Sequence, residues 1–184
     1  MSNQNNFRFL GLITLACLII LSGCASPPKT LDPSVSGPQL IVNPECIRLS
    51  VSRVMATNIV FEGSGFEAKA GDSVLITLAG PNETKVIAAE APIQSDGKFK
   101  TTVPALTKVM EFLKGDITFN EKFQNVVVIS QPPIPKGVYT GRAESMISKQ
   151  TAETKLTVKG PTIVDSLKDW IGKLTGKIQY KKGK

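Results

Sequence analysis

Residues 58–66 read NIVFEGSGF, a run of mostly apolar side chains that ends at two closely spaced glycines. The composition is that of a β-strand, and glycine permits the positive φ angles of a tight turn. Similar short runs, separated by Gly, Pro, Asn and Asp, continue on both sides from residue 39 to residue 160. Regularly spaced short strands and turns are typical of an all-β sandwich or barrel. We therefore predict that class for residues 39–160.

The expected strands are short apolar runs or alternate between apolar and polar residues. In residues 47–51 the apolar Ile47, Leu49 and Val51 alternate with Arg48 and Ser50, which predicts a half-buried strand. The other expected strands lie at 40–42, 58–62, 73–78, 85–93, 98–103, 125–130, 138–146 and 151–158.

Two features of the sequence predict how the expected strands pair. Asp96-Gly97 lies between two apolar runs and predicts a two-residue β-hairpin. The three prolines of residues 131–135 cannot donate to a strand ladder, so pairing is expected to stop there. The expected strands at 138–146 and 151–158 then form a closing hairpin.

One segment departs from the β pattern. Leu106, Val109, Met110 and Leu113 recur at helical spacing within residues 104–114, with proline at the start and glycine after the end. We expect a helix of about three turns there. Two interpretations stay open: the helix covers one open end of a sandwich, or it is an insertion that binds a partner.

Four stretches of this region together resemble bacterial immunoglobulin-like domains of cell-surface proteins. They are VFEGSGF at 60–66, AGDSV at 70–74, DGKF at 96–99 and KGVYT at 136–140. The resemblance covers residues 39–160 and implies an immunoglobulin-like β-sandwich with one short helical insertion, a fold often used for display or adhesion. It carries no catalytic residues.

The N-terminus has the pattern of a secretion signal. Arg8 is followed by thirteen uncharged residues, 9–21, which is shorter than the ~20 that a membrane-spanning helix needs. The next residues complete Leu21-Ser22-Gly23-Cys24, which resembles the lipobox of bacterial lipoprotein precursors. That resemblance implies that residues 1–23 are a removed signal peptide and that Cys24 carries a membrane-anchoring lipid. The alternative is an ordinary signal peptide or a short uncleaved anchor.

The residues after Cys24 extend this hypothesis. Ala25 stands where some related lipoproteins have an aspartate that retains them in the inner membrane, so the resemblance favours the outer membrane if the cell has one. Residues 24–38 are rich in proline and predict a tether. Cys46 would be the only other cysteine left after processing, and we expect it to be buried and unreactive.

Residues 161–184 predict an amphipathic helix and a basic tail. Ile163, Val164, Leu167, Trp170, Ile171 and Leu174 fall on one helical stripe, and Lys177, Lys181, Lys182 and Lys184 follow. A tryptophan-bearing stripe with lysines fits a helix lying on anionic lipid, which makes Trp170, Ile171, Leu174, Lys177, Lys181 and Lys182 membrane-contact candidates. The alternative is that the stripe docks on the sandwich. Gly172 and Gly176 weaken the expected helix.

Composition argues against other classes. Most of the net charge of +7 lies in the C-terminal segment, and the chain has one tryptophan and two tyrosines, so we expect no nucleic-acid partner. Without histidine the chain lacks the usual general base and the commonest metal ligand. Asp72, Glu83 and Asp96 are expected to be solvated turn residues. We expect no enzyme, cofactor or metal.

The sequence thus predicts an envelope lipoprotein that serves as a non-catalytic binding or structural module. Its expected partners are the membrane, through the lipid on Cys24, and an envelope protein or surface polymer. A second hypothesis is an envelope tether with a further membrane contact through the C-terminal helix. A weaker one is a carbohydrate-processing accessory that uses the loop carboxylates.

Overall fold

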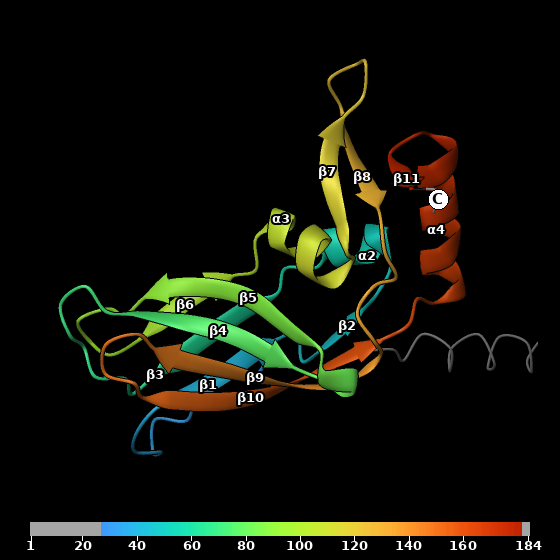
Figure 1. Ribbon diagram of the computed structural model, residues 1–184. Coiled ribbons are helices and arrows are strands. Elements are labelled where there is room, and N and C mark those ends of the chain that lie inside the picture. Colours follow the sequence, from blue (N-terminus) through green and yellow to red (C-terminus); the bar gives the residue numbers. More distant parts are fainter. Residues whose placement is uncertain (1–26, 182–184) are drawn as a thin grey trace, which may run out of the picture.

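The computed structural model describes residues 27–181 and is mostly β, with three sheets, as an all-β sandwich predicts (Figure 1). The first sheet has the order β1-β3-β6 and is antiparallel. The second has the order β2-β10-β9-β4-β5, in which only β2 runs parallel to its neighbour, β10. The strands of these two sheets are β1 (Gln39–Asn43), β2 (Cys46–Arg48), β3 (Val60–Ser64), β4 (Ser73–Ala79), β5 (Lys85–Pro92), β6 (Phe99–Thr102), β9 (Gly137–Ser145) and β10 (Thr151–Lys159).

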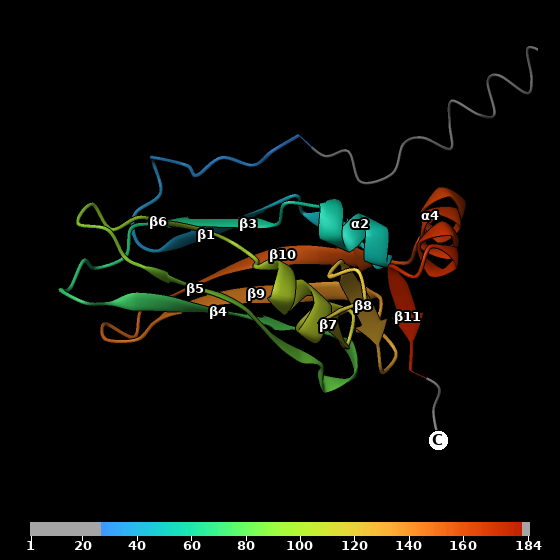
Figure 2. The same ribbon diagram turned by 90° about the horizontal axis from the view of Figure 1, so that it is seen from above.

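The core lies between these two sheets, which form separate layers in Figure 2. Strand residues alternate between the two faces of a sheet, so every second side chain points inward. In β4 the inward side chains are Val74, Ile76 and Leu78, and all three are fully buried. Phe61 of β3 and Leu156 of β10 are also fully buried. The strands expected at 58–62, 73–78 and 151–158 therefore contribute to the core.

The expected strand at 47–51 is wrong at its C-terminal end. The strand β2 ends at Arg48, and a short helix, α2 (Val51–Ala56), follows. The Ser50 side chain accepts a hydrogen bond from the Arg53 N–H, which satisfies one of the helix's N-terminal donors. Val51 and Val54 are buried, so helical spacing brings both into the core.

The expected hairpin at Asp96-Gly97 is also wrong, although the turn exists. The strands on either side of it, β5 and β6, belong to different sheets, so the turn carries the chain from one layer to the other. Gly97 has a φ of +73°, and its carbonyl accepts a 3.1 Å hydrogen bond from the Phe66 N–H. A Cβ at Gly97 would lie 2.4 Å from the Phe66 carbonyl oxygen, so this crossing requires glycine.

The expected helix at 104–114 is present in a different form. It consists of α3 (Ala105–Thr107) and one π-helical stretch, η2 (Lys108–Phe112), in which the Leu113 N–H donates to the Lys108 carbonyl. The wider π turn shifts the buried face. Val109 and Leu113 are buried as expected, but Leu106 and Met110 are exposed, and Phe112 enters the core instead.

The segment that includes this helix closes one end of the sandwich. It continues into β7 (Gly115–Phe119) and β8 (Asn125–Ile129), an antiparallel hairpin that projects from the sandwich in Figure 1. Late in the chain, α4 (Ile163–Leu174) and β11 (Ile178–Tyr180) join it, with β11 parallel to β8. The third sheet therefore has the order β11-β8-β7. A short 3₁₀ turn, η1 (Pro81–Glu83), connects β4 to β5.

Two further features concern the predicted anchor region. Residues 27–38 contain no strand or helix, but they hydrogen-bond to the sandwich near β1. The prediction for Cys46 is wrong, because its side chain is half-buried and its sulfur belongs to a disulfide.

Within residues 27–181, no helix is long and apolar enough to cross a membrane. The predicted signal peptide, Cys24 and Lys182 lie outside the described residues.

Candidate functional site: the outward face of helix α4

Hydrogen bonds cap both ends of helix α4. These caps explain why the helix forms although Gly172 lies within it and Gly176 follows it. At the N-terminus the Thr162 hydroxyl accepts from the Asp165 N–H (3.1 Å), and the Asp165 carboxylate accepts from the Thr162 N–H (2.9 Å). At the C-terminus Gly176 has a φ of +71°, and the Lys177 N–H donates to the Gly172 carbonyl at 2.9 Å. Gly176 thus ends the helix in the left-handed conformation that favours glycine.

The polar side of α4 holds the helix on the domain. The Asp169 carboxylate accepts hydrogen bonds from the backbone N–H groups of Val51 (2.9 Å) and Ser52 (2.8 Å) and from the Ser50 hydroxyl (3.1 Å). These groups lie at the start of α2, where N–H groups have no intrahelical acceptor. The contact joins α4 to α2 by charge-assisted hydrogen bonds.

The same side of α4 has a close backbone approach at Gly172. A Cβ at this position would lie 2.6 Å from Cδ1 of Ile178, a buried residue of β11. Glycine therefore allows β11 to pack directly against the helix. Gly172, which the sequence pattern counts only as a helix-weakening residue, also leaves room for the Ile178 side chain.

The apolar stripe of α4 points away from the domain. Asp165, Asp169 and Gly172 lie on the helix face opposite to the stripe, and Asp165 is 7% exposed. The stripe side chains are all exposed: Ile163, Val164, Leu167, Trp170, Ile171 and Leu174. The interpretation that the stripe docks on the sandwich is therefore wrong.

The charges around the stripe have one sign. The two acidic residues of α4, Asp165 and Asp169, both face the domain, while Lys168 and Lys173 are exposed. Lys173 lies 4.0 Å from the ring centre of Tyr180, a cation–π contact. Lys177 and Lys181 follow the helix and are exposed as well. The outward surface of α4 is thus apolar and cationic.

Burial raises the pKa of Asp165, but hydrogen bonds from the Thr162 backbone and hydroxyl and the positive charges of Arg53 and Arg48 outweigh it, so the pKa lies below its ordinary value. The carboxylate stays ionised at neutral pH. Its charge is therefore balanced inside the domain and does not reduce the cationic character of the outward surface.

Asp72 and Glu83 are not arranged as the carboxylate pair of a glycosidase. Asp72 and Glu83 flank opposite ends of β4, whereas the two acids of a glycosidase lie within about 10 Å of each other. The prediction that Asp72 is a solvated turn residue is wrong, because Asp72 is 2% exposed. Its carboxylate accepts from the Ser145 hydroxyl (2.6 Å) and the Ile147 N–H (3.0 Å), so it holds the β9–β10 turn. Asp96 forms an exposed ion pair with Lys98.

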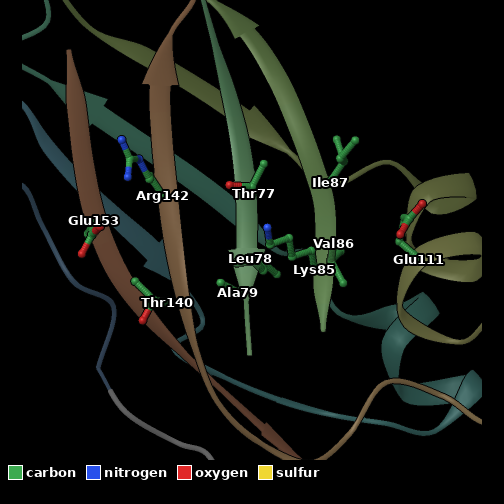
Figure 3. A pocket seen from close by; sticks show the side chains of 10 residues that line it. All are labelled: Thr77, Leu78, Ala79, Lys85, Val86, Ile87, Glu111, Thr140, Arg142 and Glu153. Atoms are coloured by element: carbon green, nitrogen blue, oxygen red, sulfur yellow. The ribbon is translucent and has the colours of Figure 1, made fainter. Parts of the chain in front are cut away.

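A concave feature lies on the outer face of the five-stranded sheet. The cavity, of about 660 Å³, lies over β4, β5, β9 and β10, with Glu111 of η2 at one side (Figure 3). Its charged side chains, Lys85, Glu111, Arg142 and Glu153, come from four different elements and carry no net charge. In the described part of the chain, no group of three or more acidic, cysteine or histidine side chains could hold a metal.

Sequence reasoning identified most of this site. It placed Trp170, Ile171 and Leu174 on one stripe with Leu167, and the structure brings them together. It missed the role of Asp169, because a carboxylate on the polar face of an amphipathic helix looks solvated unless its partner is known. No protein-family model, curated protein or solved structure matches this chain.

Proposed function

We propose that this chain is a lipid-anchored protein of the bacterial envelope, located at the outer membrane if the cell has one. Its folded part is a non-catalytic immunoglobulin-like sandwich. Its second membrane contact is α4, which binds anionic lipid through its apolar stripe and the lysines around it. The sandwich remains available to an envelope protein or surface polymer.

Two features support the immunoglobulin-like assignment. The strands divide into a β1-β3-β6 sheet and a sheet in which β10, β9, β4 and β5 are neighbours, as in sandwiches of that type. Near the start of β9, the buried Tyr139 donates its hydroxyl hydrogen to the Pro135 carbonyl at 2.8 Å. This resembles the tyrosine corner of immunoglobulin-like domains, with the insertion at 105–129 lying just before it.

The observation that carries the lipid contact is the orientation of α4. An amphipathic helix normally buries its apolar side against its own domain. Here the acidic residues make the intramolecular contacts, and Trp170 is 55% exposed within the stripe. Helices that lie in the lipid interface typically combine an apolar face that includes tryptophan with lysines beside it. Each lysine close to an anionic surface contributes about 1 kcal/mol.

The stripe is tested with unlipidated protein, residues 25–184, sedimented with anionic and neutral vesicles. Deleting residues 161–184 would remove buried Ile178 and the Asp169 contacts, so the variant should instead be Leu167→Gln with Ile171→Gln. Its matched control is Ile87→Gln with Val138→Gln, two exposed apolar side chains of the sandwich. We expect wild type and control to bind anionic vesicles and the α4 variant to lose binding. Equal binding by all three would contradict the proposal.

The anchor is tested by the mass of the Cys24 peptide from protein made in bacterial cells, analysed without reduction. Cys17 and Cys24 are the only other cysteines of the chain, and the proposed processing would remove Cys17 and place the Cys24 sulfur in a thioether. The lipid on Cys24 and an intrachain disulfide of Cys46 therefore exclude each other. A Cys24 N-terminus bearing a diacylglyceryl group supports the proposal. A cross-linked Cys24–Cys46 peptide, or an unmodified Cys24, would contradict it.

A further inference from the structure

The chain before β1 is fixed to the domain close to its predicted anchor. The Asn43 side chain makes two hydrogen bonds with the backbone of Lys29, accepting from its N–H (2.8 Å) and donating to its carbonyl (2.9 Å). The Lys29 ammonium also pairs with the Glu45 carboxylate. Lys29 is thereby held at the end of β1.

A second pair of contacts holds the middle of this segment. The Gln39 side chain accepts from the Asp32 N–H (3.2 Å) and donates to the Asp32 carbonyl (2.8 Å). Much of the predicted tether therefore lies along the sandwich, and only the residues before Lys29 remain as a link to Cys24. Five residues of fully extended chain span at most about 18 Å.

The fixed point and α4 lie toward the same end of the molecule. Asn43 ends β1 and Glu45 immediately precedes β2, which leads into α2, and Asp169 of α4 caps α2. In Figure 2 the blue segment runs over the β1 side of the sandwich toward the end that carries α2 and α4. The stripe of α4 faces away from α2 at this end.

We propose that α4 binds the same leaflet that holds the lipid on Cys24, so that the domain lies against its own membrane and does not bridge two membranes. This inference rests on the proposed function. The partner of the stripe is the lipid surface for two reasons. The short link keeps α4 within reach of this surface, and the outward side of α4 is apolar and cationic. A second copy would present the same cationic surface, and like charges repel each other.

Trp170 is the only tryptophan of the chain, so its fluorescence reports the contact directly. Full-length lipidated protein is reconstituted into anionic vesicles and mixed with a second, protein-free population. Brominated lipid, which quenches tryptophan at short range, is placed in only one population at a time. We expect quenching when it is in the host vesicles. Quenching from the second population, with vesicle clustering, would overturn the inference.

The outcomes separate this inference from the proposed function. If unlipidated protein binds anionic vesicles but host lipid does not quench the lipidated protein, only the same-leaflet inference fails. If unlipidated protein does not bind and neither population quenches, both fail.

Releasing the fixed segment tests the short link itself. Asn43→Ala leaves the hydrogen bonds between Gln39 and Asp32 in place, so the link would lengthen from five residues to eight, which lowers the effective concentration of α4 at its membrane about twofold. The salt concentration that releases Trp170 from host lipid should therefore fall, while Asn58→Ala, at an exposed asparagine, should not change it. A twenty-residue Gly-Ser insertion after Ser26 leaves residues 27–181 unaltered and should lower it further. An unchanged release point with the insertion would overturn the inference.

Discussion

The Asp169 carboxylate lies 2.9 Å from the backbone nitrogen of Val51 and accepts its hydrogen bond. The two residues are 118 positions apart in the sequence, and their contact joins α4 to α2. It also determines which side of α4 faces outward, because a helix held by its acidic side must present its apolar side elsewhere.

Asp169→Ala should loosen α4 and destabilise the protein. Loss of a helix-capping side chain costs about 0.5–2 kcal/mol, and here three hydrogen bonds are lost together. Urea unfolding measures the cost, and hydrogen exchange at the Val51 and Ser52 amides shows where it arises. Asp116→Ala, at an exposed position of β7, is the control and should change stability little. Equal stability of the two variants would contradict the capping role.

Gly172→Ala should lower stability, although alanine favours helices by about 1 kcal/mol. The added Cβ would lie within 3 Å of the Ile178 side chain, and overpacking of this kind costs about 1–3 kcal/mol. Thermal unfolding of this variant should be compared with that of Ser166→Ala, at an exposed position of the same helix, which should be neutral or slightly stabilising. A higher melting temperature for Gly172→Ala would show that Ile178 moves away freely.

The stripe should contribute little to folding. Leu167→Gln is expected to change the free energy of unfolding by no more than about 0.5 kcal/mol, because its side chain is exposed. In contrast, Leu156→Ala removes a fully buried side chain and should cost about 2–5 kcal/mol. Denaturant titration of both variants checks this difference. A cost above 2 kcal/mol for Leu167→Gln would mean that the stripe packs against the protein in solution.

Asp72 should make stability depend on acid pH. Burial raises its pKa, but hydrogen bonds from Ser145, Ile147 and Ser148 more than offset this and hold the pKa below its ordinary value. The stabilisation is therefore present above the ordinary carboxyl pKa of about 4 and is lost as the pH falls through the lower folded-state pKa. Unfolding measured between pH 7 and pH 2 should show a smaller loss for Asp72→Asn than for wild type. Parallel curves would contradict this role.

Tyr139→Phe removes the hydroxyl that donates to Pro135 while keeping the ring in the core. Because the Pro135 carbonyl loses this partner, the variant should be destabilised by about 1–2 kcal/mol. Chemical unfolding, with Tyr180→Phe as the control at an exposed tyrosine, measures the difference. If the two substitutions have equal effects, the hydroxyl makes no net contribution.

Local patterns predicted most strands because alternation of apolar and polar residues directly reflects which side of a sheet is buried. Which strands pair with each other was harder to predict from the sequence. Asp96-Gly97 has hairpin composition, yet its strands join different sheets, since the pairing of a strand depends on distant residues. The helix at Val51 was missed for a related reason: its capping by Asp169 comes from the other end of the chain.

For the candidate site, helical spacing revealed the stripe of α4 but not its orientation. An amphipathic pattern shows that one side of a helix is apolar; what covers that side depends on the contacts of the other side. Those contacts are the Asp169 hydrogen bonds and the close approach at Gly172, neither of which has a local sequence signal. The π turn at η2 similarly changed which residues of a correctly predicted helix enter the core.

The parallel pairing of β11 with β8 also has a consequence for how the protein is synthesised. Residues 125–129 emerge from the ribosome about fifty residues before their partner strand, Ile178–Tyr180. The small sheet therefore cannot be completed until nearly all of the described chain has been made. Partners this far apart in sequence slow folding, because the intervening chain must be closed into a loop first. Until β11 pairs with it, β8 therefore presents an unpaired strand edge, which is a template for pairing with another chain.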